Sequence, residues 1–245
     1  MKFSISRFRY RFTPHWMMCV LALLGIAFFI ALGVWQLHRA EEKRLILERK
    51  FAFEHQAPRV WDGSGIQPKP FEGVQVQGTF MPQVFLLDNQ MYAHQVGYHV
   101  LSPLDIGTER VIMIDRGWIP VGATRSEIPD IITPTEQLIL EGRAYYSLGK
   151  PWLLGPGIEI KHAGSAVIEA LDLQLMEQFL HKAIYPFIIR LDKKSPAGYV
   201  RSWAAVSMPP ERHLGYAVQW FAFALVVFII FIALNIRTYE KTNSN

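Results

Sequence analysis

A single histidine, His213, stands where a charged segment passes into a long apolar run. If a helix begins there, Tyr216, Ala217, Trp220 and Ala224 fall on the same face as the histidine. A neutral imidazole is a common metal ligand, and an aromatic face suits a flat apolar molecule. The same residues are also typical of the aromatic belt of a membrane span, so spacing alone leaves both interpretations open.

The remaining residues offer little catalytic chemistry. The sequence contains no G-x-S-x-G, no H-E-x-x-H, no phosphate-binding loop and no dinucleotide fingerprint. His94 and His99 flank a predicted glycine turn, Val96-Gly97-Tyr98, where exposed loop polarity is a better explanation than a metal pair. Asp88 and Asp115 are interpreted as turn formers at strand ends. We therefore do not expect an enzyme, although a membrane-tethered enzyme without a recognisable motif stays as an alternative.

The chain has 1 cysteine, Cys19, which lies inside the first apolar run. A disulfide framework within the chain, a thiolate pair for copper, a multi-cysteine zinc site and a C-x-x-C-H haem attachment are therefore excluded. A small buried apolar residue is the expected role of Cys19.

Two long apolar segments must position His213 and the aromatic residues near it. They also explain why the composition is 51% apolar and only 19% charged. The windows 16–35 and 213–234 are each long enough to cross a bilayer core, which takes about 20 helical residues. A basic tail precedes the first window, as in a signal peptide, but no small-x-small cleavage site follows it. We therefore predict a retained anchor and a second, antiparallel span. This arrangement would place Trp35 and Gln36, at the exit of the first span, near the depth of His213.

The basic residues predict the orientation of the two spans. The tails 1–15 and 235–245 hold six bases and one acid, whereas the segment between the spans holds 19 bases and 20 acids. Positive flanks stay in the cytoplasm, so both termini should be cytoplasmic and the central segment 36–212 should lie outside. Its near-neutral charge gives no support for nucleic-acid binding.

The central segment reads as a small α+β domain. Residues 37–56 have helix-forming composition, and 57–70 is a Pro- and Gly-rich linker. Residues 170–183 predict one amphipathic helix, with Leu171, Leu175 and Phe179 on its apolar face. Strand patterns occupy the runs VQVQGTF, VFLLDN, YHVLSPL, RVIMIDRGW, QLILEGRAYY and FIIRLD. The predicted fold is two antiparallel transmembrane helices flanking a small, mainly antiparallel β domain, barrel- or sandwich-like, with one amphipathic helix.

Three stretches resemble the Surfeit-locus family of cytochrome c oxidase assembly factors. They are LGVWQLHRAEEKRLIL, then GYHVLSPL with VIMIDRGWIP, and finally GYVRSWAAVSMPPERHLGYAVQWFAFAL. The resemblance covers nearly the whole chain, and its most specific pieces are Trp35 with Gln36, the turn Arg116-Gly117-Trp118, and His213 with Trp220. The stretch 158–181 contains no motif that contributes to this resemblance.

This resemblance implies a membrane protein that helps to build haem-copper oxidases, with its domain in the bacterial periplasm or the mitochondrial intermembrane space. The short tail before the first span has no long amphipathic Arg/Ser helix of the mitochondrial targeting kind, which favours a bacterial inner membrane with a periplasmic domain. It implies binding of haem a on its way to oxidase subunit I, with haem a synthase as a possible donor. His213 would then be an axial ligand, with Tyr216, Trp220 and Trp35 beside the macrocycle and Arg116 as a possible propionate contact. For Arg116 and Trp118, a structural role is the favoured interpretation, with a propionate or partner contact of Arg116 as the alternative. The alternative function is a scaffold that holds subunit I without binding haem.

Overall fold

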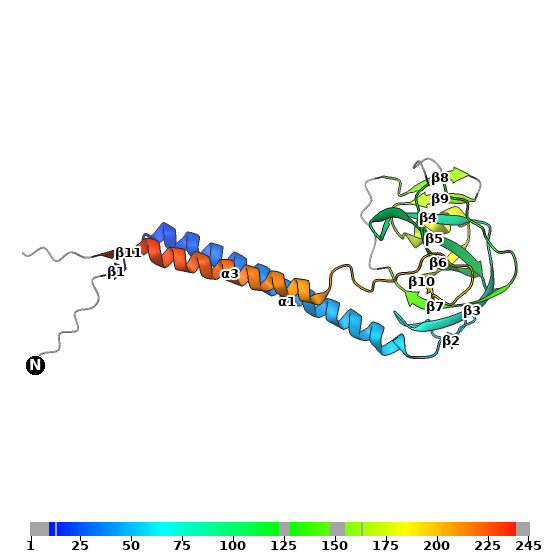
Figure 1. The fold of residues 1–245 in the computed structure, drawn as a ribbon, viewed down its shortest axis with the longest axis horizontal. Helices are drawn as coiled ribbons and strands as arrows, with labels where there is room; N and C mark the ends of the chain where they lie inside the picture. Colours follow the sequence, from blue (N-terminus) through cyan, green and yellow to red (C-terminus); the bar gives the residue numbers. More distant parts are fainter. Residues whose placement is uncertain (1–9, 13, 123–127, 148–154, 163, 239–245) are drawn as a thin grey trace, which may run out of the picture. The chain divides into compact units, whose positions relative to one another are not determined.

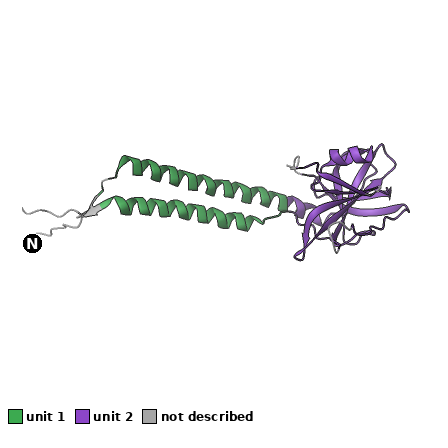
Figure 2. Cartoon of the chain, turned by 90° about the horizontal axis from the view of Figure 1, so that it is seen from above, with its two compact units in different colours: residues 1–47, 206–245 green, residues 48–205 purple. Residues whose placement is uncertain are grey.

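The computed structural model describes residues 10–12, 14–122, 128–147, 155–162 and 164–238. The chain divides into two compact units. One contains residues 1–47 and 206–245, and the other contains residues 48–205 (Figure 2).

The first unit is built on two long helices that run side by side, α1 (Trp16–Glu54) and α3 (Pro210–Asn235) (Figure 1). Both are long and apolar enough to cross a membrane. Small and polar residues form their buried seam, namely Gly33, Gln36, Ala40, His213, Ala217, Ala224 and Asn235. Large apolar side chains point outward along both helices, as expected of surfaces that face lipid. Beyond the helix ends, β1 (Tyr10–Phe12) pairs antiparallel with β11 (Ile236–Thr238).

The end of α1 belongs to the second unit, because residues 48–54 group with the β domain. Arg143 holds this end by donating hydrogen bonds to the carbonyl oxygens of Phe53 and Glu54 at 2.9 and 3.0 Å. These carbonyls have no partner within the helix, and a cation also suits the negative end of the helix dipole. The helix therefore ends on a basic residue of the domain.

The second unit is a mixed sheet closed into a small barrel. Its strands are β2 (Arg59–Val60), β3 (Gly73–Phe80), β4 (Val84–Tyr92), β5 (Gln95–Asp105), β6 (Arg110–Pro120), β7 (Leu138–Tyr145), β8 (Ile158–His162), β9 (Ser165–Ile168) and β10 (Ala183–Leu191). Their order is β2-β3-β7-β10-β6-β5-β4-β9-β8, and a further pairing joins β3 to β5. This pairing closes β3, β7, β10, β6 and β5 into a ring, in which β6 and β10 run parallel and the other neighbours antiparallel.

Alternation along the strands separates the two faces of the barrel. Phe187, Ile189 and Leu191 of β10 point into one buried cluster with apolar residues of β3, β6 and β7. Ile184 and Ile188 point to the opposite face, where a second cluster includes Met176 and Leu180 of α2 (Leu173–Leu180). Asp172 caps α2 by accepting hydrogen bonds from the backbone N–H groups of residues 174 and 175.

The predicted fold class is confirmed, with differences in detail. All six predicted strands are present, but β8 and β9 lie in a stretch for which no strand was predicted. The amphipathic helix is shorter than the predicted 170–183, and its fully buried positions are Met176 and Leu180 rather than Leu175 and Phe179. The turn predicted at Gly97 is wrong: Gly97 lies within β5, and the turn uses Ala93 and His94, which adopt φ of 47° and 65°.

Candidate functional site

His213 lies in the first turn of α3 and is 8% exposed. Its Nδ1 is 2.7 Å from Oε1 of Gln36, which lies on α1 in the same unit. An amide oxygen can accept a hydrogen bond and cannot donate one, so Nδ1 carries the hydrogen and donates it. In a neutral ring, this contact places the hydrogen on Nδ1 and leaves the lone pair on Nε2.

The second ring nitrogen of His213 is unusual. Nε2 is buried and has no hydrogen-bond partner among the described residues. Leaving a buried polar atom unpaired costs free energy, and proteins seldom keep such atoms without a reason. A neutral imidazole held at Nδ1 by an oxygen acceptor, with Nε2 unoccupied, is the usual arrangement of a histidine that ligates a metal.

The rest of the predicted stripe on α3 divides into buried and exposed residues. Ala217 and Ala224 are buried against the helix pair, as is His213. Trp220 is partly buried and stacks on Phe29 of α1, with ring centroids 5.8 Å apart and an interplanar angle of 20°. Tyr216 is 42% exposed, so it lies away from the seam.

Trp35 and Gln36 take different positions although they are neighbours in the chain. Gln36 is buried and contacts His213, whereas Trp35 is 50% exposed and carries the Arg39 guanidinium 5.6 Å from its ring centroid. Successive residues on a helix point about 100° apart, so both cannot face α3. The expected pairing of this stretch with His213 is therefore made by Gln36.

Close packing of the two helices continues one turn before Gln36. A Cβ placed on Gly33 would lie 2.5 Å from Cε1 of Phe221. Glycine is thus the residue that lets the Phe221 ring lie against the backbone of α1. No role is predicted for Gly33 or Phe221 from the sequence, although a small residue in an apolar helix is a known signal of close helix contact.

Arg116 lies in the barrel unit and is 2% exposed. It donates hydrogen bonds from Nε to the carbonyl of Ala197 at 2.7 Å and from Nη2 to that of Ile132 at 2.8 Å. The guanidinium carbon lies 5.1 Å from the ring centroid of Phe80 and 5.0 Å from that of Tyr199. Burial lowers the pKa of Arg116, and the Tyr199 hydroxyl opposes this in part. These contacts give Arg116 a structural role, which joins β6 to the segment after β10.

Gly117 and Trp118 complete this junction. Gly117 adopts a φ of 114°, at an irregularity in the pairing of β5 with β6. The Trp118 backbone N–H donates to the carbonyl of Val200 at 2.7 Å, and its Nε1 donates to that of Gln90 at 2.9 Å. Trp118 is 5% exposed, so it packs in the domain rather than at a surface. Two stretches that carry the family resemblance therefore bind each other.

Asp115 does not lie in a turn at the end of a strand, as predicted. It lies inside β6, and its Oδ2 is 3.0 Å from Nδ1 of His99 and 3.7 Å from Nε of Arg190. The side chain of Asp115 is 2% exposed. The turn interpretation is therefore wrong, because strand pairing brings these distant residues together.

Comparison with known proteins gives one consistent match. A model described as the SURF1 family matches residues 23–225. A SURF1-like protein of Rickettsia felis is 27% identical over 226 residues, which cover 87% of this chain and 94% of the relative. A SURF1-like protein of Rickettsia prowazekii is 27% identical over 229 residues, covering 86% of this chain and 87% of the relative. A SURF1-like protein of Caenorhabditis briggsae is 24% identical over 246 residues, covering 89% of this chain and 75% of the relative.

Proposed function

Because this chain belongs to the SURF1 family, which is known as a family of oxidase assembly factors, we propose that it binds haem a through His213 and assists its insertion into subunit I of cytochrome c oxidase. In this role haem a is cargo rather than a permanent cofactor. A haem a synthase is the natural class of donor, because the cargo has to come from the enzyme that makes it.

The observation that carries this proposal is the state of the His213 ring. Gln36 accepts a hydrogen bond at Nδ1, and Nε2 is buried without a partner among the described residues. Haem iron takes a neutral imidazole nitrogen as an axial ligand, and a hydrogen bond at the other nitrogen orients the ring. His213 therefore has the donor atom, the tautomer and the support that haem ligation requires.

The surroundings of His213 also suit an apolar macrocycle. Trp220 and Phe29 stack on each other along the same helix pair, and Phe223 contacts both rings with centroids 5.7 Å away. Because Nε2 is buried, a ligand reaches it after neighbouring side chains move aside. Such gating fits a carrier, which has to accept and release its cargo.

The proposed location is a bacterial inner membrane, with both termini in the cytoplasm and the barrel unit in the periplasm. The two apolar helices and the excess of basic residues in the tails support this topology. The proposed work of the protein is binding and delivery, without a catalytic step.

The test is the visible spectrum of the protein purified from cells that make haem a. We expect a Soret band in the wild type and loss of most of it in His213→Ala, because the bond to iron is removed. Accumulation should be normal, because the aromatic contacts of Trp220 and the other apolar contacts between the helices remain. His213→Met should keep part of the band, since a thioether also ligates haem iron. The matched control is His38→Ala, which removes an exposed histidine of α1 and should leave the band unchanged.

The same experiment distinguishes a haem carrier from a scaffold that holds subunit I without binding haem. A colourless wild-type protein that still co-purifies with subunit I would establish the scaffold and reject haem binding. A His213→Ala protein with an unchanged Soret band would move the axial role to another residue.

A further inference from the structure

The barrel unit contains a basic pocket with a volume of ≈ 510 Å³. It lies between the end of α1, strands β7 and β10, and the segment that follows β10. Its charged lining residues are Lys50, Arg143, Arg190, Lys193 and Lys194, together with Glu54 and Asp192. The excess of basic over acidic side chains favours an anion in this pocket.

Arg190 is the central cation of this pocket. Its guanidinium carbon lies 3.5 Å from the ring centroid of Tyr145 and 5.4 Å from that of Trp203. The Arg190 side chain forms no hydrogen bond with any described residue. Its buried Nε lies 3.7 Å from Oδ2 of Asp115, with which it forms an ion pair. This guanidinium is held between two rings and ion-paired to Asp115 through Nε, so its terminal N–H groups are the donors that remain for a planar or tetrahedral oxyanion.

The other basic residues of the pocket differ in how many hydrogen bonds and ion pairs they form within the protein. Arg143 already donates hydrogen bonds to the carbonyl oxygens of Phe53, Glu54 and Phe71. The side chains of Lys50, Lys193 and Lys194 make no ion pair within the described ranges, and the last two are exposed. Three lysines without an ion pair to any described residue therefore line the pocket beside the guanidinium of Arg190.

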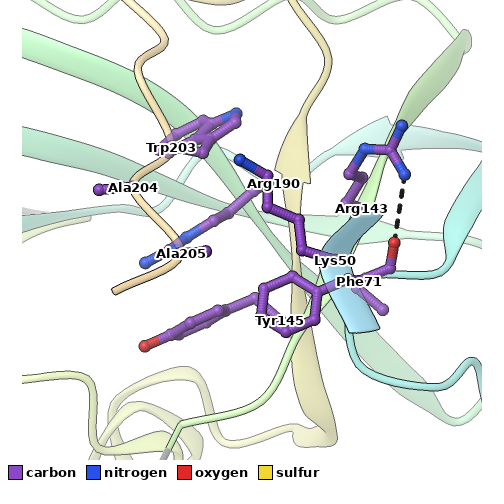
Figure 3. A pocket seen from close by; sticks show the side chains of 9 residues that line it. Lys50, Phe71, Arg143, Tyr145, Arg190, Trp203, Ala204 and Ala205 are labelled. Atoms are coloured by element: carbon purple, nitrogen blue, oxygen red, sulfur yellow. Dashed lines mark hydrogen bonds between the residues drawn. The ribbon is translucent and has the colours of Figure 1, made fainter. Parts of the chain in front are cut away.

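An apolar pocket adjoins the basic one and shares Lys50, Arg143, Arg190 and Trp203 with it (Figure 3). Its other lining residues are Phe71, Ala144, Tyr145, Ala204 and Ala205. Figure 3 shows Lys50, Arg190 and Trp203 converging from three separate segments of the chain. A ligand with a charged group and a short apolar part would contact both surfaces.

We propose that this pocket binds a phosphate group, supplied either by an anionic phospholipid or by a small phosphate-bearing solute. Arg190 donates to two phosphate oxygens, while Lys50, Lys193 and Lys194 neutralise the remaining charge. A phosphate is favoured over a single carboxylate because it carries more charge and more acceptor oxygens for these donors. This site is independent of haem and of His213.

The experiment has one arm for each source of the phosphate. Inorganic phosphate is titrated by calorimetry into the full-length protein in a phosphate-free maltoside detergent. Separately, the protein is placed in phosphatidylcholine nanodiscs with and without phosphatidylglycerol, and native mass spectrometry counts the phospholipids that it retains. Binding in the first arm identifies a solute phosphate, and selective retention of phosphatidylglycerol identifies the lipid.

Two variants test the residues. Arg190→Lys keeps a cation beside Asp115, so the barrel should fold, but it loses the planar fork and should weaken binding roughly tenfold. The double variant Lys193→Gln, Lys194→Gln changes exposed side chains and should weaken binding while leaving the unfolding temperature unchanged. Arg110→Gln is the control, because Arg110 is exposed and lies outside the lining of the pocket.

The proposal fails if neither arm detects binding that depends on Arg190. It also fails if Arg110→Gln weakens binding as much as Arg190→Lys does, because that result would reflect the net charge of the protein rather than a site. Retention of phosphatidylglycerol by all variants alike would likewise assign the lipid to the helices and not to this pocket.

Discussion

At the scale of single residues, the candidate site depends on Gln36 as well as on His213, because Gln36 is the hydrogen-bond partner of the histidine ring. Its Oε1 accepts the hydrogen bond that sets the tautomer and orientation of the His213 ring. Gln36 therefore positions the His213 ring, and in the proposed haem site it would act on the ligand through the histidine. Such supporting hydrogen bonds strengthen metal binding by fixing the ring and raising its basicity.

Gln36→Leu keeps the size of the side chain but removes the acceptor. We expect the affinity for haem to fall by about tenfold or more, with a shifted Soret maximum, because Nδ1 loses its partner and the ring becomes free to rotate. The measurement is a haem titration followed in the visible spectrum. Gln219→Leu, at an exposed position of α3, is the control. Wild-type affinity and an unshifted band in Gln36→Leu would show that the ring is oriented by other contacts.

Arg116 illustrates how a family signature can be structural. Arg116→Met should lower the free energy of unfolding of the domain by about 3 kcal/mol, because two carbonyls lose their donor inside the protein. Thermal unfolding of the purified protein measures this, with the exposed Arg110→Met as the control. If Arg116→Met instead unfolds at the wild-type temperature and loses haem, the residue is a propionate contact.

At the scale of secondary-structure elements, the approach of α1 to α3 depends on small residues in the seam. Gly33 leaves room for the ring of Phe221, whereas a Cβ on Gly25 would lie 3.6 Å from Val227, an ordinary contact. The two glycines of one helix therefore differ in how much space they have. Close packing at Gly33 also holds Gln36, one turn later, within reach of His213.

Gly33→Ala should destabilise the helix pair by about 1–3 kcal/mol, because the new methyl group overlaps the Phe221 ring. Gly25→Ala should be neutral or slightly stabilising, because alanine favours the helix. Thermal unfolding in detergent compares the two. The double variant Gly33→Ala, Phe221→Ala should recover part of the loss, and the absence of any recovery would show that the clash lies elsewhere.

Periodicity was sufficient for most elements but not for the contacts between them. The six predicted strands alternate or run continuously apolar, which a sequence displays directly. Strands β8 and β9 have 5 and 4 residues, too short for a pattern to stand out. The antiparallel order of the two spans predicts that Gln36 lies near the depth of His213, but it does not predict the hydrogen bond between them. By contrast, the proximity of Asp115, His99 and Arg190 depends on the register of three strands, which local sequence does not encode.

At the scale of the whole molecule, the distribution of charge predicts the topology. The tails are basic and the segment between the two apolar helices is almost neutral, so the barrel unit should cross the membrane and the tails should not. This orientation matters for function, because it decides from which side the domain meets its partners.

Reporter fusions measure this topology. A reporter active in the periplasm should function when fused near Pro68, in the loop before β3, and fail when fused after Asn245. A reporter active in the cytoplasm should give the opposite pattern. Cytoplasmic activity near Pro68 would contradict both the charge argument and the proposed site of action.

The position of β10 in the barrel has a consequence for biosynthesis. β10 is the last strand of the ring in the chain, yet it lies between β6 and β7. Until residues 183–191 emerge, the edges of β6 and β7 have no partner at that place, and exposed edges pair readily with other chains. The parallel pairing of β10 with β6 also joins segments far apart in the chain, which slows folding. A chain that ends before β10 would therefore leave the barrel as an open sheet, which favours aggregation and proteolysis rather than a smaller version of the domain.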